Sequence, residues 1–231
     1  PAFQGSKTNV GFDSVTGAIS LAGTGNFDSS TDIDSESSID DIGGVSTTGT
    51  YLFNETLDLG AVFSLDLRKI IQTASVYSTD LFDSITDLDA RQDFDGTGSV
   101  DTNAEVFVQS SQDGTNYSGF QKFANGTFKG RTFKFKCVLT TKDTNQDIRV
   151  SQLGYFAEFQ RRTEQSTTTI ASGAGAKSIT FNSPFFSGTS ALLGANSNPP
   201  AIGITAFNMA SGDFFELSSI TGTGFTVHFK N

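Results

Sequence analysis

The chain has 231 residues and contains no tryptophan, one cysteine, one histidine and four prolines. A single cysteine cannot form a disulfide within the chain, so the cysteine count gives no sign of an oxidising compartment. One cysteine and one histidine are also too few for the usual zinc site. A nucleophile activated by histidine would depend on His228 alone, which lies in an alternating apolar stretch typical of a strand. We therefore expect the chain not to be an enzyme.

Long apolar runs and a basic net charge are also missing. No stretch of about 18 apolar residues is present to span a membrane, and no secretory signal opens the chain. The formal net charge of −10 argues against nucleic acid as the main partner. No lysine or arginine lies between Lys7 and Arg68, whereas residues 122–162 are rich in both. The acidic and basic parts could meet, within one chain or between copies, or both could simply face solvent.

Phenylalanine and glycine are abundant instead, with 23 and 24 residues. Serine and threonine dominate the polar positions, and no amphipathic pattern of three helical turns occurs, with 64–73 as the only ambiguous stretch. Large rings separated by small polar residues are typical of short strands that each contribute a few side chains to a thin core. The composition predicts an all-β protein built of β-sandwich modules.

The clearest strand pattern lies in residues 130–159, GRTFKFKCVLTTKDTNQDIRVSQLGYFAEF. Apolar residues occupy every second position of 133–139, which predicts one buried face and one solvated face. Cys137 belongs to the apolar row, so we expect a small buried hydrophobe rather than a reactive thiol. Lys134 and Lys136 belong to the solvated row, where they could meet the acidic N-terminal third of this chain or of a neighbouring copy.

A polar turn at 142–146 joins this strand to a second one, in which the alternation slips by one residue at Ser151 and Gln152. A slip of this kind predicts a β-bulge. Residues 130–159 are therefore predicted to be a long hairpin that closes the first module.

Further strands are expected on the same criteria at 18–21, 50–66, 69–76, 105–110, 178–181, 201–206, 213–217 and 224–229. The Asp113–Gly114 pair predicts a hairpin turn. Because residues 160–176 are polar or small, we place a domain boundary near 163. This divides the chain into an extended acidic segment at 1–45 that could dock on a neighbour, a first β-sandwich at 46–163, and a second β module at 164–231.

Three stretches together resemble modules of phage tail proteins. TYLFNETLDLG at 50–60 looks like the Gly-Tyr-Tyr-Phe … Ile-Asp-Leu-Gly opening of their discoidin-like modules. Residues 93–143 resemble the body of the same module, with its Ser-x-Asp-Gly turn and its Gly-x-Arg-x-Phe-x-Phe-x-x-x-Leu strand; the position that often carries tryptophan holds Tyr117 or Phe120. Residues 178–231 are similar to the H-type-lectin-like C-terminal module of phage host-specificity and central tail-fibre proteins.

The resemblance implies a structural component of a phage tail tip or tail fibre, located in the tail of the virion, that takes part in host-cell recognition and attachment. It implies a discoidin-like or jelly-roll sandwich at 46–163, a lectin-like module at 164–231 that lacks its last strand, and a homotrimer. The implied partners are other phage tail proteins and a host-cell surface receptor, either a glycan or an outer-membrane protein, with no nucleic acid and no membrane insertion.

Two alternatives to attachment stay open. One is a purely structural virion spacer or decoration protein without receptor binding, and the other is a carbohydrate-binding module. The sequence opens with Pro1 and stops at Asn231 directly after a strand-like run, so we expect it to be a fragment of a longer protein.

No cofactor is expected, apart from Ca²⁺ as a candidate cation. Asp93, Asp95 and Asp101 form the candidate metal site, because carboxylates in a loop with two intervening glycines offer the oxygen ligands that Ca²⁺ prefers. Their spacing does not match an EF-hand. A second acidic cluster lies at 32–36, and both clusters could instead be solvated loop residues.

The candidate receptor contacts are exposed aromatic and polar residues of loops in the second module, Phe207, Asn208, Asp213 and Phe214. Phe214 is followed by another phenylalanine, and only one of two adjacent strand residues can enter the same core. The other must face solvent, a neighbouring chain or a receptor, with burial in a subunit interface as the favoured reading. The same reasoning applies to the pair at 185–186, and these doubled rings support the homotrimer.

Overall fold

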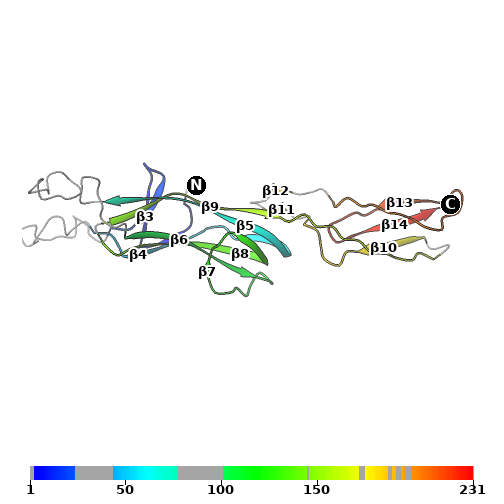
Figure 1. The fold of residues 1–231 in the computed structure, drawn as a ribbon, viewed down its shortest axis with the longest axis horizontal. Helices are drawn as coiled ribbons and strands as arrows, with labels where there is room; N and C mark the ends of the chain where they lie inside the picture. The colour runs from blue at the N-terminus through cyan, green and yellow to red at the C-terminus, as the bar shows by residue number, and fades with distance from the viewer. Residues whose placement is uncertain are drawn as a thin grey trace, which may run out of the picture.

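The computed structural model describes residues 3–23, 44–77, 101–144, 146–171, 175–186, 189–190, 194–195 and 199–230. These residues form strands and turns without any helix, so the prediction of an all-β fold is confirmed. Figure 1 shows an elongated molecule with a large sheet toward one end and a small three-stranded sheet at the other. None of the described residues belongs to a helix that could cross a lipid bilayer.

Fourteen strands are present in the described residues. In chain order they are β1 (Ser6–Thr8), β2 (Val10–Asp13), β3 (Ala18–Leu21), β4 (Thr48–Leu52), β5 (Leu57–Tyr77), β6 (Thr102–Ser111), β7 (Gln121–Lys122), β8 (Gly126–Thr141), β9 (Gln146–Phe159), β10 (Ala176–Thr180), β11 (Thr189–Ser190), β12 (Gly194–Ala195), β13 (Phe214–Ser218) and β14 (Gly224–Lys230).

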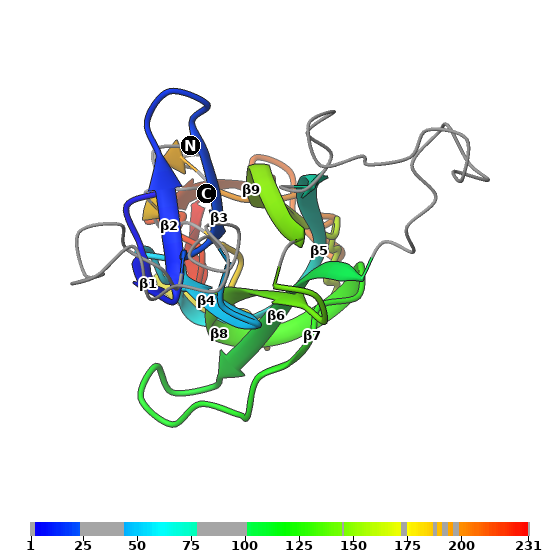
Figure 2. The same cartoon turned by 90° about the vertical axis from the view of Figure 1, so that its left-hand side faces the viewer.

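The large sheet is antiparallel and runs in the order β1-β4-β8-β5-β9-β3-β2, with β6 also paired to β8 and β7 to β6. β1 and β2 lie at opposite ends of this order, yet β2 follows β1 directly in the chain. The two ends of the sheet therefore meet, and backbone hydrogen bonds join the chain segments beside them. The Ala22 amide donates to the Asn9 carbonyl at 3.0 Å, and the Ser46 amide donates to the Ala22 carbonyl at 2.9 Å. Viewed from its end, the sheet encloses the core as a nearly closed wall (Figure 2), and opposite walls pack face to face as in a β-sandwich.

The two strands predicted at 130–159 are present as β8 and β9, but the predicted hairpin is wrong, because β5 lies between these strands in the sheet and they do not pair with each other. Phe133, Phe135, Cys137 and Leu139 are fully buried, which confirms the predicted alternation on β8. Burial of each large apolar side chain contributes about 1.5–3 kcal/mol, so this row is a major part of the core energy. Thr132 departs from the pattern, because it is buried on the opposite side of the strand.

Two irregularities shape the long strands, and the sequence analysis predicted the second of them. The register between β5 and β8 shifts between Asp58 and Phe63, where Gly60 has a φ of +77° that favours glycine. The register between β5 and β9 shifts at Ser151, because Gln72 pairs with Gln152 while the next residue of β5 pairs with Val150. The predicted bulge at this position is therefore confirmed.

Residues 3–23 belong to the large sheet, so the prediction of an extended segment outside the first module is wrong for them. They form β1 to β3 and contribute Phe3, Val10, Ile19 and Leu21 to the buried core. The sequence signal was weak because these strands are short and their few apolar residues are separated by glycine, serine and threonine. The sequence predicted only one strand in this region, at 18–21, and it is confirmed as β3.

The small sheet consists of β10, β14 and β13 in that order. Its pairing aligns Phe215 with Phe229 and Leu217 with Val227, so these four side chains share one face. Val227 is the only one of the four that is fully buried. The predicted strand at 201–206 is not formed, although exposed and half-buried side chains alternate there. This small sheet has little core of its own in the described part of the chain.

A joint of aromatic rings connects the two parts. Phe186 packs against Phe63 of β5 with ring centroids 5.7 Å apart, and it stacks on Phe159 of β9 at 4.5 Å. Phe185 instead packs edge-on against Phe181 at 5.0 Å, and its amide donates to the Gly222 carbonyl beside the small sheet. The expectation that one ring of this pair faces solvent, a partner or a receptor is therefore wrong, because each ring packs against a different part of the same chain.

Arg162 completes this joint. Its guanidinium lies 4.0 Å from the ring centroid of Phe185, and it donates to the Ser183 carbonyl at 2.7 Å. Glu164 accepts a hydrogen bond from the Asn182 amide at 2.7 Å. The segment that follows β9 is thus held to residues 182–186 by polar as well as aromatic contacts.

Candidate functional site

The four predicted receptor contacts lie in and beside one turn, and Figure 1 shows this end of the small sheet farthest from the large sheet, close to the C-terminus. The Asp213 carboxylate accepts a hydrogen bond from the Ala210 amide at 2.7 Å, and the Asp213 amide donates to the Ala210 carbonyl at 3.1 Å. Asn208 has a φ of +61°, a conformation that asparagine tolerates better than most residues. The turn is therefore built from local hydrogen bonds, and we call residues 207–214 the distal turn.

Two rings of the distal turn remain accessible to solvent. Phe207 is 82% exposed and Phe214 is 47% exposed. Phe214 lies at the first position of β13, opposite Lys230, whose ammonium group is 6.0 Å from the ring centroid. Phe215 points to the opposite face, where its ring lies 6.0 Å from that of Phe229. The sequence prediction for this pair is confirmed, since one ring joins the apolar face and the other does not.

The lone histidine lies on the polar face of the small sheet. His228 Nε2 is 3.0 Å from Ser218 Oγ, and His228 is aligned with Glu216 on the neighbouring strand. A Ser-His-acid relay would need the carboxylate on the other ring nitrogen. The Glu216 carboxylate instead pairs with Lys230, and this hydrogen bond is the main reason that the pKa of Glu216 is lowered. The arrangement fits a structural cross-strand network, and the absence of enzymatic activity stays a prediction.

Of the three candidate metal ligands, only Asp101 belongs to the described residues. Asp93 and Asp95 lie outside the described residues, as does the acidic cluster at 32–36. Asp101 lies directly before β6, where its amide donates to the Gln146 side chain and its carboxylate is 3.7 Å from Lys142 Nζ. Among the residues that the structure describes, no group of three or more histidine, cysteine or acidic side chains could hold a metal ion. The Ca²⁺ site stays a prediction.

The predicted turn at Asp113 is present and tightly bonded. One Asp113 carboxylate oxygen accepts hydrogen bonds from the Thr115 amide, the Asn116 amide and Ser111 Oγ, each at 2.8 Å, and the other accepts from the Asn116 side chain at 2.6 Å. These bonds, led by those from Asn116, hold the pKa of Asp113 well below its usual range. Gly114 adopts a φ of +88°, which explains why the sequence signal included glycine.

Cys137 carries no accessible thiol. It is fully buried between Phe135 and Leu139 on β8, and burial raises its pKa to about 12. A nucleophilic or metal-binding thiol needs the opposite conditions, namely exposure and a lowered pKa. The prediction of a small buried hydrophobe is confirmed.

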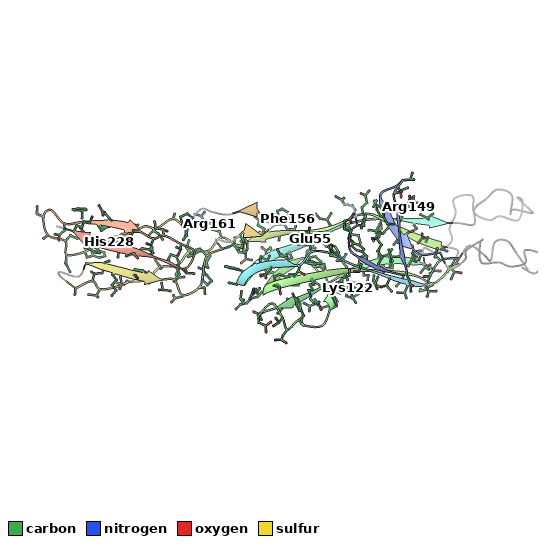
Figure 3. All side chains as sticks on the ribbon, turned by 180° about the vertical axis from the view of Figure 1, so that it is seen from behind. Glu55, Lys122, Arg149, Phe156, Arg161 and His228 are labelled. Carbon is green, nitrogen blue, oxygen red and sulfur yellow. The ribbon has the colours of Figure 1, made fainter. Side chains whose placement is uncertain are left out.

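The structure also reveals contacts that the sequence analysis missed. Lys134 and Lys136 lie on the solvated face of β8 as predicted, yet their ammonium groups sit over aromatic rings of the loop between β6 and β7. No sequence signal connected these lysines to Tyr117 and Phe120, because the contact depends on how the loop folds back over the sheet. Other charged side chains, such as Arg149, are spread along the molecule rather than gathered in one place (Figure 3).

The chain was compared with models of protein families, with curated proteins and with solved structures, and none of these comparisons finds a match.

Proposed function

We propose that this chain is a structural component of a phage tail tip or tail fibre that takes part in host-cell recognition and attachment. The observation that carries the proposal is the pair of accessible rings, Phe207 and Phe214, in the turn at the far end of an elongated all-β molecule. Exposed aromatic side chains on a rigid scaffold are the usual anchors of recognition surfaces. The resemblance of 50–60, 93–143 and 178–231 to phage tail modules supports the same proposal.

The proposed assembly is a homotrimer in the tail of the virion, bound to other tail proteins. The small sheet supports self-association, because its apolar face includes half-buried Phe215, Leu217 and Phe229 beside a single fully buried residue, Val227. A face of this kind is stabilised when copies of the chain cover it. Sedimentation equilibrium of the full-length protein tests this point, since a stable monomer contradicts the trimer.

A virion spacer without receptor binding is the second candidate. The joint around Phe186 favours it, because a firm connection between two β units suits a part that holds other parts at a fixed distance. Under this reading the exposed rings of the distal turn are buried against another tail protein. A carbohydrate-binding module outside any virion is the third candidate, and binding to isolated glycans without association with phage particles would favour it.

The position of the chain in the assembled particle separates the first two candidates. Antibodies raised against the purified chain would be bound to intact phage particles and located by electron microscopy. Labelling at the free end of the tail is the expected result. Labelling confined to a collar, or epitopes that become accessible only after the particle is dissociated, would contradict attachment and support the spacer.

A further inference from the structure

A row of outward-facing side chains crosses four strands of the large sheet, at a distance from the distal turn. Pairing places Leu52 of β4 beside Lys136 of β8, Lys136 beside Phe107 of β6, and Phe107 beside Lys122 of β7. Lys134 lies two residues before Lys136 on β8 and therefore shares its face. Leu52 is 37% exposed, and Phe107 and both β8 lysines are half-buried, so this side of the sheet is open to solvent.

The loop between β6 and β7 adds two further rings to this surface. Lys134 Nζ lies 4.2 Å from the ring centroid of Tyr117, and Lys136 Nζ lies 4.6 Å from that of Phe120 and 5.4 Å from that of Phe107. Cation–π contacts of this length attract each ammonium group toward a ring and restrict its position. We call these five residues the aromatic–lysine face. Its three rings are half-buried, so part of each stays accessible.

The two lysines of this face are not neutralised in the described part of the chain. No ion pair there joins Lys134 or Lys136 to a carboxylate, whereas nearby Lys122 pairs with Glu105 and Arg131 pairs with Asp58. Within the described residues, two adjacent ammonium groups without an acidic partner are unexpected in a chain with a formal net charge of −10. Their local charge therefore remains available to an external anion.

We infer that the aromatic–lysine face binds an acidic polysaccharide. The apolar faces of sugar rings pack on aromatic side chains, and the carboxylate or sulfate groups of the polymer meet the two ammonium groups. Gln109 of β6 is aligned with Lys134 of β8, and its side-chain amide offers hydrogen bonds to sugar hydroxyls. Two positive charges are too few to neutralise the dense charge of a nucleic acid, whereas the aromatic rings add contacts that suit sugar rings. This inference is independent of the attachment proposed above.

Binding of the purified chain to alginate, which carries carboxylates, and to heparin, which also carries sulfates, tests the inference by calorimetry. Neutral dextran and poly-glutamate serve as comparison polymers. We expect binding to at least one acidic polysaccharide that weakens as salt rises from about 50 to 500 mM, and no binding to dextran. Absence of binding to both acidic polymers at low salt would overturn the inference. Equal binding of poly-glutamate would also overturn it, because charge alone would then be recognised.

Three variants locate the binding on the face. The double variant Lys134→Gln/Lys136→Gln is expected to bind at least about fivefold more weakly, and Lys134→Arg/Lys136→Arg is expected to keep the affinity because both charge and ring contact are retained. Lys142→Gln/Lys177→Gln removes the same charge from the turn after β8 and from β10, and it is expected to bind like the wild type. An equal loss in this control would contradict a localised face. Unchanged melting temperatures show that the variants are folded. A failure to bind acidic polysaccharides would not count against the proposed attachment to the host, which is tested separately by adsorption.

Discussion

The ring of Phe186 stacks on the ring of Phe159, with centroids 4.5 Å apart and planes 27° from parallel. Phe159 is the last residue of β9 in the large sheet, whereas Phe186 follows the first strand of the small sheet. This contact and the edge-on packing of Phe186 against Phe63 are the aromatic contacts that join the two β units.

Replacement of Phe186 by alanine is expected to loosen this joint. Loss of a half-buried ring with two aromatic partners costs about 1–3 kcal/mol, and residues 160–171 lose the support of the segment at 182–186. Trypsin should then cleave at Arg161 and Arg162 faster than in the wild type. Phe207→Ala is the matched control, because Phe207 is 82% exposed and touches no part of the joint. Equal cleavage rates in all three proteins would show that the joint does not depend on Phe186.

The closure of the large sheet makes a second prediction. A Cβ atom added at Gly49 would collide with the Asn9 carbonyl and would lie 2.7 Å from a methyl group of Val10. Gly49→Ala is therefore expected to lower the free energy of unfolding by about 2–3 kcal/mol in urea denaturation. Gly11→Ala is the control, because a Cβ there meets nothing within 4 Å, and we expect a change of about 0.5 kcal/mol or less. A neutral Gly49→Ala would contradict the packing of β4 against the β1–β2 corner.

The turn at Asp113 predicts a pH dependence. Its carboxylate accepts hydrogen bonds from the Asn116 and Thr115 amides, and these bonds lower its pKa in the folded state. Because the folded pKa lies below the unfolded one, the stabilisation is present above about pH 4 and is lost only as the pH falls further. The NMR signals of these two amides should stay constant from pH 7 to about 4 and move below it. A midpoint between pH 4 and 5 would contradict the hydrogen-bond network.

The same turn can be tested by mutation. Asp113→Ala removes both carboxylate oxygens and the four hydrogen bonds that they accept, and it should increase amide exchange at 114–117 at neutral pH. Glu158→Ala is the control, since Glu158 is an exposed acid whose contact with Arg68 is 3.7 Å long and lies on another strand. Protection that is unchanged by Asp113→Ala would show that the loop is held by other contacts.

The sequence predicted the parts of the fold that have a strong local pattern. Alternation on β8 placed Phe135 and Cys137 in the core, the slip at Ser151 marked the bulge, and the Asp113–Gly114 pair marked the turn. Each of these features is decided by neighbours in sequence, because strand side chains alternate and glycine permits a positive φ. Local rules were therefore sufficient for them.

Features that depend on distant contacts were not predicted. Outside the predicted strand at 18–21, residues 3–23 carry too few large apolar side chains to indicate strands, yet pairing of β1 with β4 places Lys7 against Tyr51. The rings at 185–186 pack against two different parts of the chain, which no periodicity can reveal. Likewise, the stacking of Lys134 on Tyr117 depends on a loop folding back over the sheet. Of the proposed receptor contacts, the sequence predicted that one of Phe214 and Phe215 would be accessible, and the structure identified which.

Competition for host adsorption tests the central claim most directly. Cells would be incubated with the purified chain before phage is added, and the unadsorbed phage would be counted. We expect the wild type to block adsorption. The double variant Phe207→Ser/Phe214→Ser should need a protein concentration at least about tenfold higher for the same block, because two aromatic anchors are lost. Val15→Ser should block like the wild type, since Val15 is more exposed than either ring, at 92%, but lies at the tip of the β2–β3 hairpin. Undiminished adsorption at saturating wild-type chain, or equal blocking by the double variant, would contradict attachment through the distal turn.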